Sequence, residues 1–342
     1  MEKPSRHDMI REEGMSRPPN SGWRPEAEPE ADERQPRRRR FSIRSNVTEM
    51  EKGRKSLNNN GAFDGSFAGT VRQKTSVYLL PWYLRKQYFI EGWTDPAIWK
   101  AALVELFATA FQFYLSGQFG ISLMNFQISA ALPAYVGVYT SLLLATSIYA
   151  TAPASGGHLN PLITFTSMIC GLCPAPRAVV YMVAQVTGGA LAGGMLRGSW
   201  GTERAESHMG GGVFFDPTTI TPGQVLVTEI MSSATIVFAA LGIGLDPRQQ
   251  AVFGPQLGPL LVGIAVGLVT ASTTGIAPGY TGASINPARA FGLAVARGSF
   301  EYQWIWWVGP LIGSIVVATM YNVAPPFHGQ DEDEPMTEQN TR

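Results

Sequence analysis

Charge is scarce in most of this sequence. Charged residues make up 15% of the 342 residues, below the roughly 25% that is usual for soluble domains. Of the 26 lysines and arginines, 19 lie within the first hundred residues, and the stretch from about 96 to 324 is apolar, glycine-rich and nearly free of charge. This division argues against a soluble globular protein. It predicts a membrane domain with polar tails, because a helix that spans the bilayer core needs about 20 apolar residues.

Cysteine is also scarce, and its two residues, Cys170 and Cys173, form the motif CGLC. Such a pair is a redox motif when it lies near a βαβ pattern, which this sequence lacks. We therefore interpret the two cysteines as small residues near the membrane surface and expect neither a metal nor a cofactor. No nucleophile, base and orienting residue form a recognisable set, so we do not expect an enzyme.

A secretory signal peptide is not visible, because the first sixty residues are charged and contain no apolar stretch. Residues 1–75 have too little apolar surface to fold and are predicted to be a disordered cytoplasmic tail. Residues 76–96 mix aromatic and basic side chains, as interfacial segments do. Residues 97–323 are the predicted membrane domain, and 324–342 form an acidic cytoplasmic tail.

A basic cluster, residues 37–40, directly precedes Phe41 and Ser42. Three interpretations stay open: contact with anionic lipid head groups, a recognition site for a kinase that modifies Ser42, and a solvated charge run that orients the protein. The cluster is short and lacks interleaved aromatic side chains, so we do not expect a nucleic-acid partner. The bias of lysine and arginine predicts that both termini are cytoplasmic.

Six apolar stretches are long enough to span a lipid bilayer, and two shorter ones are not. The short stretches begin at Asn160 and Asn286 and each runs for about ten residues, as re-entrant half-helices inside a protein do. The six predicted spans are 97–117, 133–152, 177–197, 222–245, 255–275 and 303–322.

The chain contains an internal repeat. The segment GGHLNPLITF at 156–165 matches GASINPARAF at 282–291, and Asn160 and Asn286 are 126 residues apart. Upstream of each lies a single acid in an apolar span, Glu105 and Glu229, 124 residues apart. Each copy therefore holds three spans and one half-helix. Because three is odd, the second copy enters the membrane from the opposite side, which is an inverted repeat.

The two Asn-Pro pairs are typical helix starts. Asparagine is a favoured N-cap, and Pro161 and Pro287 suit the first helical position because they lack an amide hydrogen. Each half-helix then points the positive end of its dipole, roughly half a charge, at the membrane centre. Amide donors and two positive ends favour neutral polar solutes over cations, including protons.

Glu105 and Glu229 are ionisable groups inside membrane spans, where such groups usually mark function. As proton carriers they would indicate a coupled transporter, and as structural groups they would accept hydrogen bonds from irregular backbone beside the half-helices. We favour the structural role, because no other acid lies in the spans. Arg289 follows the second Asn-Pro pair and is predicted to offer donors to a solute and to repel cations. His158 is interpreted as a loop-ordering residue, with a titrating gate as the alternative.

The chain resembles the aquaporin (major intrinsic protein) family in its two Asn-Pro boxes, its paired glutamates, and the segments SGGHLNP, INPARAFG and WWVGPLIG. The resemblance covers about 97–323. It implies an all-α membrane protein with six transmembrane helices and two half-helices, assembled as a homotetramer with one pore per subunit. The long N-terminal tail is similar to that of fungal members, in which it can close the cytoplasmic mouth. Tyr78, Tyr83 and Tyr88 are our candidates for such a plug.

The sequence departs from the family at the first box, where Leu162 stands in place of the usual alanine. The second box keeps Ala288. Leu162 is bulkier and is expected to change the packing of its half-helix, while the asparagine and its cap survive.

The family's selectivity constriction corresponds to Thr140, Thr270, Ala283 and Arg289. This set lacks the aromatic residue and the histidine of strict water channels, so it predicts a wider constriction that admits glycerol, urea, hydrogen peroxide or ammonia. Other markers, including Ala290 and Ala294, are similar to the water-channel subgroup. We therefore expect a passive channel for water, small neutral solutes or both, in the plasma membrane. The alternatives are a coupled transporter and an adhesion or signalling member with a poorly conducting pore.

Overall fold

The computed structural model describes residues 82–126, 131–247 and 253–323. Within these ranges, six helices are long and apolar enough to cross a membrane, which confirms the predicted number of spans. They are α3 (Pro96–Phe126), α4 (Leu132–Ser155), α6 (Ala175–Trp200), α8 (Pro222–Ala240, continued by the π-helical turn η3, Leu241–Leu245), α9 (Gly254–Thr273) and α11 (Ile305–Val323). Ser42 and Tyr78 lie outside the described residues, as do both tails, 1–75 and 324–342.

The first span begins one residue before and ends nine residues after the predicted range of 97–117. The predicted span ends at Gly117, yet α3 continues through Gln118 and Ser122 to Phe126. Those polar side chains are satisfied within the bundle: the Gln118 Nε2 donates to the Tyr114 hydroxyl at 2.8 Å, and the Ser122 hydroxyl donates to the Gln118 carbonyl at 3.0 Å. A polar residue therefore does not end a helix when its side chain finds a partner there.

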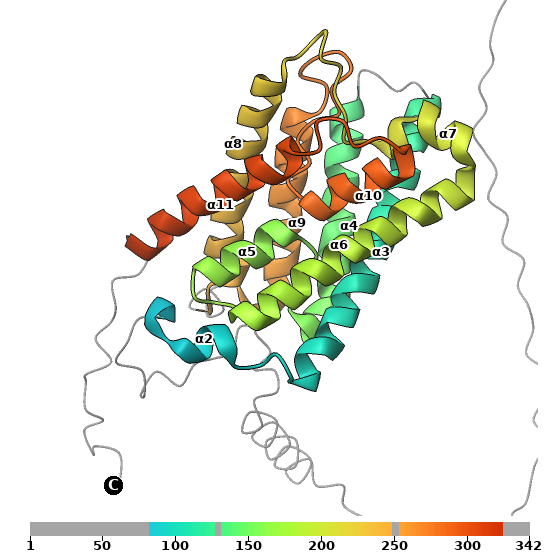
Figure 1. Cartoon of the computed structure of the whole chain (residues 1–342). Coiled ribbons are helices and arrows are strands. Elements are labelled where there is room, and N and C mark those ends of the chain that lie inside the picture. The colour runs from blue at the N-terminus through green and yellow to red at the C-terminus, as the bar shows by residue number, and fades with distance from the viewer. Residues whose placement is uncertain (1–81, 127–130, 248–252, 324–342) are drawn as a thin grey trace, which may run out of the picture. The chain divides into compact units, whose positions relative to one another are not determined.

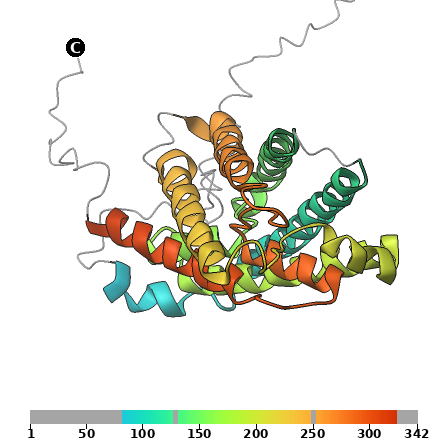
Figure 2. The ribbon, with the colours of Figure 1, turned by 90° about the horizontal axis from the view of Figure 1, so that it is seen from above.

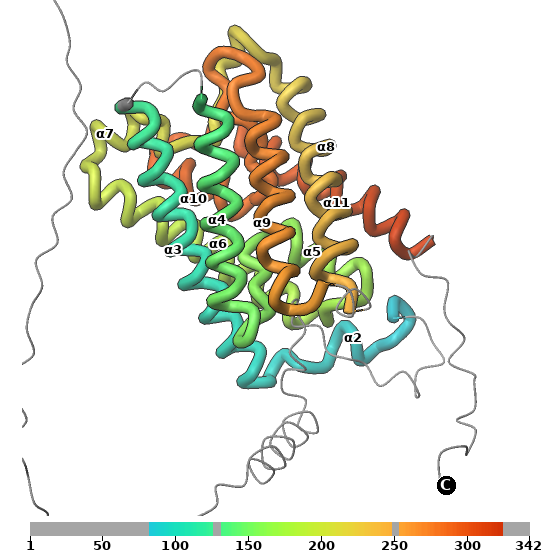
Figure 3. The backbone as a smooth tube through the Cα atoms, turned by 180° about the vertical axis from the view of Figure 1, so that it is seen from behind, coloured from blue at the N-terminus to red at the C-terminus, as the bar shows by residue number. Residues whose placement is uncertain are grey.

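The two half-helices are α5 (Pro161–Ile169) and α10 (Pro287–Arg297). In the inverted repeat, α3, α4, α5 and α6 correspond to α8, α9, α10 and α11. Figure 1 shows α5 and α10 within the bundle, and Figure 3 shows α4 and α9 side by side. Seen from above, α3, α4, α8 and α9 line up along one side, and α6 and α11 along the other (Figure 2).

Glycine allows one close approach that shapes the centre. A Cβ on Gly189 of α6 would collide with the Ala288 carbonyl of α10, and a Cβ on Gly292 of α10 would collide with the Gly189 carbonyl. The two backbones are therefore in direct contact, as small residues permit in membrane helices.

Short helices cover the ends of the bundle. On the side where α5 ends lie η1 (Trp82–Leu84) and α2 (Lys86–Ile90), and on the other side lie α7 (Thr202–Ser207) and η2 (Met209–Gly211). Tyr88 of α2 is buried, and its hydroxyl lies 2.6 Å from the carbonyl oxygens of both Met168 and Cys173. Burial raises the pKa of Tyr88. The segment before the first span is thereby attached to the end of α5.

Candidate functional site

An asparagine side chain caps the N-terminus of each half-helix, Asn160 in α5 and Asn286 in α10. The Asn160 Oδ1 accepts a hydrogen bond from the Leu162 backbone N–H at 2.9 Å. The Asn286 Oδ1 accepts from the backbone N–H groups of Ala288 and Arg289, at 3.0 and 3.2 Å. Proline stands at the first helical position of each. Both side-chain oxygens are thus occupied by the caps, which fixes the orientation of each carboxamide.

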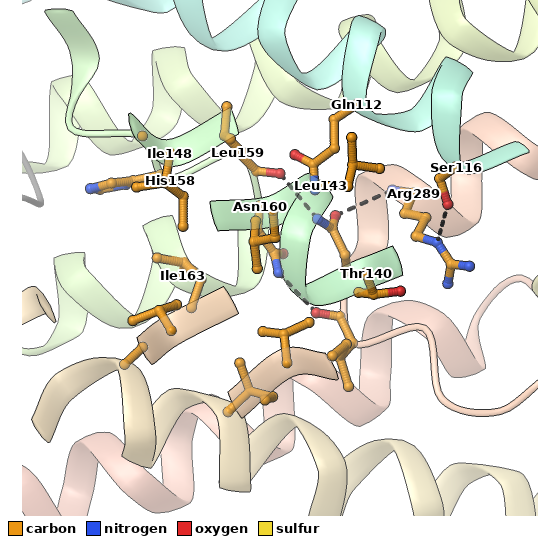
Figure 4. A pocket seen from close by; sticks show the side chains of 18 of the residues that line it. Gln112, Ser116, Thr140, Leu143, Ile148, His158, Leu159, Asn160, Ile163 and Arg289 are labelled. Carbon is orange, nitrogen blue, oxygen red and sulfur yellow. Dashed lines mark hydrogen bonds between the residues drawn. The ribbon is translucent and has the colours of Figure 1, made fainter. Parts of the chain in front are cut away.

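The two asparagines also reach across the repeat boundary. The Asn160 Nδ2 donates to the Ile285 carbonyl at 2.9 Å, and the Asn286 Nδ2 donates to the Leu159 carbonyl at 3.0 Å (Figure 4). An amide nitrogen carries two hydrogens, so each asparagine retains one donor after this exchange. Both line the same cavity, and the remaining donors are available to a molecule inside it.

The residue before each asparagine has a strained backbone. Leu159 has φ 51° and Ile285 has φ 50°, a left-handed conformation that is unfavourable for a bulky residue such as leucine and for a β-branched one such as isoleucine. Such strain persists only where the surroundings enforce it, and it gathers at functional sites. Here it points each carbonyl at the opposite asparagine.

The two buried glutamates enforce that conformation. Glu105 accepts from the backbone N–H groups of His158 and Leu159 at 3.0 and 2.7 Å. It also accepts from the Ser155 hydroxyl at 2.6 Å and the Gln185 Nε2 at 2.9 Å.

Glu229 repeats the arrangement in the second copy. It accepts from the backbone N–H groups of Ser284 and Ile285, the latter at 3.0 Å. Each carboxylate therefore holds the loop that precedes a half-helix.

His158 lines the cavity and is also held from several sides. Its Nδ1 lies 3.0 Å from the Thr164 hydroxyl, and its ring meets the Tyr181 ring edge-on at 5.6 Å. Only 4% of the residue is exposed. These contacts place His158 as part of the loop framework, with one edge toward the cavity.

The cavity has one polar side and one apolar side. The polar side is formed by the two loops, with 156–159 from the first copy and 284–285 from the second. The apolar side comes from the long helices and includes Phe113, Leu143, Leu144, Ile148, Val262 and Val266. A molecule in the cavity meets hydrogen-bonding groups along one track only, apart from the side chains described below.

At one end the cavity adjoins a second hollow. Residues of α3 and α4 and the loop segments 211–214 and 274–281 line this second hollow. Three residues line both spaces: Ser116, Thr140 and Arg289. The Arg289 Nε donates to the Ser116 hydroxyl at 3.4 Å. The junction of the two hollows therefore consists of one cation and two small hydroxyl side chains.

The remaining predicted constriction residues lie differently. Thr270 lines the inner cavity, with its hydroxyl donating to the Val266 carbonyl at 2.7 Å. Ala283 is not among the lining residues; it packs with Ile236 and Ile285. The third residue at the junction, beside Thr140 and Arg289, is Ser116, which sequence reasoning missed.

Ser116 and another lining residue, Gln112, carry a signal that the sequence holds. They follow Glu105 by eleven and seven residues, so all three lie on one face of α3. Leu162, by contrast, does not line the cavity and packs among Val237, Leu241 and Val317.

Neither Tyr83 nor Tyr88 lines the cavity. Tyr83 is 58% exposed and borders a groove between α5 and α11. In this conformation the two side chains do not plug the pore.

Six spans surround a cavity that has one polar side, and the asparagines at the N-termini of two half-helices line it. This arrangement defines a membrane channel. The chain belongs to the major intrinsic protein family, whose model matches residues 92–321. It is 39% identical to probable aquaporin TIP4-1 of Oryza sativa subsp. japonica over 56% of this chain and 73% of that protein. It is 30% identical to probable aquaporin TIP-type alpha of Phaseolus vulgaris over 69% of this chain and 92% of that protein.

The fold is also similar to that of a solved structure, the aquaglyceroporin from Plasmodium falciparum. The TM-score is 0.56 at 18% identity, and the match covers 66% of this chain and 96% of that one. Membership of the major intrinsic protein family makes the chain a channel for water and small solutes, and not an enzyme.

Proposed function

We propose that this channel passes small neutral solutes such as glycerol and urea in addition to water, and that it excludes ions and protons. The junction between the two hollows carries the proposal. Among the described residues, Ser116 and Thr140 line both spaces together with Arg289, and neither is aromatic. Small hydroxyl side chains leave more room than a ring would, and they offer hydrogen bonds to a hydroxyl or amide solute.

Exclusion of ions follows from the charges that surround the path. Arg289 places a cation at the junction, and α5 and α10 direct their positive dipole ends at the cavity centre through Asn160 and Asn286. No carboxylate among the described residues lines the cavity. A cation that enters would therefore lose its water shell without gaining a counter-charge.

Stopped-flow light scattering on proteoliposomes tests the solute range. An impermeant sugar gradient should cause fast shrinkage, and a glycerol gradient should cause shrinkage followed by rapid re-swelling. In Thr140→Phe the ring narrows the junction, so water flux should persist while glycerol re-swelling is lost. Shrinkage of the native protein without re-swelling would show a strict water channel. Flux no greater than that of empty liposomes would contradict the channel itself.

We further propose a homotetramer in the plasma membrane with both termini in the cytoplasm. The orientation rests on the 19 basic residues within the first hundred, since positive segments stay inside. Native mass spectrometry in detergent should give four times the chain's 37.0 kDa. Protease added to intact cells should leave an N-terminal tag uncleaved, and cleavage of that tag would reverse the orientation.

A further inference from the structure

A line of polar side chains runs along α3 on the face toward the cavity. Glu105, Thr109, Gln112 and Ser116 are spaced by four, three and four residues, which places them on one face of a helix. The two ends have assigned roles: Glu105 holds the loop before α5, and Ser116 accepts from Arg289. Gln112 lies between them and lines the cavity.

The oxygen of the Gln112 carboxamide lacks a hydrogen-bond donor among the described residues. This Oε1 atom is buried. Figure 4 shows the side chain reaching from α3 toward the cavity beside Leu159 and Asn160. A buried, unpaired amide costs about 1–3 kcal/mol, so an apolar side chain would be more stable at this position. A molecule inside the cavity that Gln112 lines would supply the missing donor.

We propose that Gln112 contacts the permeating solute and is a third carboxamide of the pore beside Asn160 and Asn286. The two asparagines use their oxygens in the helix caps and offer only N–H donors to the cavity. Gln112 adds an acceptor, and it does so from α3, whose neighbouring lining residue, Phe113, is apolar. This assignment rests on the proposed passage of neutral solutes.

The chemistry favours solutes with several N–H or O–H groups, such as urea and glycerol. A solute that fills the cavity displaces the water around it, so the wall must supply its hydrogen bonds. Water in single file keeps bonds to its neighbours and depends less on any one wall group. Gln112 should therefore raise solute passage more than water passage.

Gln112 also borders a groove between α3 and α4, together with Leu143. If the carboxamide served that groove, its loss would change helix packing or assembly and leave selectivity alone. The experiment below separates the two roles.

The first arm asks whether Gln112 faces the lumen. The two native cysteines are buried, so Gln112→Cys introduces the accessible thiol. Mercuric chloride should block water flux in Gln112→Cys proteoliposomes, with recovery on adding a thiol, and should not block the native protein. An unblocked Gln112→Cys channel would overturn the proposal. This arm requires only water flux, so it tests the position of Gln112 even in a channel that rejects urea and glycerol. Rejection of both solutes by the native channel would overturn the proposed function and not the placement of Gln112 in the lumen.

The second arm measures selectivity with Gln112→Leu. The ratio of urea to water permeability should fall about five-fold, the equivalent of one hydrogen bond of about 1 kcal/mol. The thermal midpoint should stay or rise, because an unpaired polar group is removed. The control is Gln118→Leu on the same helix, which loses bonds to Tyr114 and Trp200; it should lower the midpoint and keep the ratio. An unchanged ratio in Gln112→Leu, whatever its midpoint, would refute the contact.

Discussion

The hydroxyl oxygens of Thr166 and Ser314 are 3.0 Å apart, at a place where the other half of the molecule has two glycines. Thr166 follows Asn160 by six residues, as Gly292 follows Asn286. Gly292 of α10 meets Gly189 of α6 backbone to backbone, whereas the corresponding helices α5 and α11 are joined through the side chains of Thr166 and Ser314. The backbones of α5 and α11 are therefore separated by side chains, and a larger residue can fill the space beside α5. This accounts for Leu162 where the second copy has Ala288.

Giving each position the residue of the other copy should destabilise the fold, by leaving a cavity at position 162 and by overfilling the space at position 288. Leu162→Ala should lower stability by about 2–5 kcal/mol through the cavity it leaves among Val237, Leu241 and Val317. Water flux per folded channel should remain, because Leu162 does not line the pore. Ala288→Leu should not yield a folded channel, because Ala288 is fully buried against Gly189.

Thermal unfolding in detergent, followed by size-exclusion chromatography, measures both variants. A Leu162→Ala channel that is as stable as the native protein would show that the packing argument is wrong. A changed solute range in that variant would give Leu162 a role in the pore.

The buried carboxylates should prove structural. Glu105→Gln replaces one acceptor oxygen by an N–H₂ group, which then faces two donors: either Ser155 and His158 at Oε1 or Leu159 and Gln185 at Oε2. Each lost bond to a charged group is worth about 1.5–3 kcal/mol, so the yield of folded protein should fall sharply.

A milder control removes one donor and keeps the carboxylate. Gln185→Leu leaves the other three donors to Glu105, so its thermal midpoint should lie between those of the native protein and Glu105→Gln. A pH-sensitive dye inside the liposomes should report no proton uptake in the native channel. A stable Glu105→Gln protein that loses a proton-driven flux would establish the transporter alternative instead.

The sequence contains most of this architecture because the decisive signals are local. Each signal reflects a property of the residues themselves. The two Asn-Pro pairs indicate helix starts, the two lone acids indicate buried groups that need hydrogen-bond donors, and the six apolar runs indicate spans in contact with lipid. The cross-repeat bonds of Asn160 and Asn286 depend on loops 126 residues apart.

The details that sequence reasoning missed are set by packing. In the sequence, Ser116 and Gln112 look like ordinary polar residues within a span. Their role becomes visible only when the structure shows that their face of α3, which they share with Glu105, borders the cavity. Ala283 follows Gly282, whose φ of 88° sets the course of the loop, and its side chain joins an apolar cluster. Neither fact follows from residue type.

The native thiols should resist modification. Cys170 is 5% exposed and Cys173 is 2% exposed, and burial raises the pKa of both to about 12. At pH 8 the reactive thiolate is then on the order of one part in ten thousand. Iodoacetamide should label neither residue in the folded channel and both after denaturation in SDS. Rapid labelling at pH 8, read by mass spectrometry, would mean that the end of α5 opens.

Tyr88 should behave as an anchor of α5 and not as a plug. Tyr88→Phe removes the hydroxyl that bonds the carbonyls of Met168 and Cys173, at a cost of about 1–3 kcal/mol. The thermal midpoint should fall by several degrees, and water flux per folded channel should not rise. Tyr83→Phe is the matched control, because that side chain is exposed and its change should alter neither quantity. A Tyr88→Phe channel that conducts faster than the native one would show that Tyr88 obstructs the pore, since loss of an anchor alone gives no reason for a wider path.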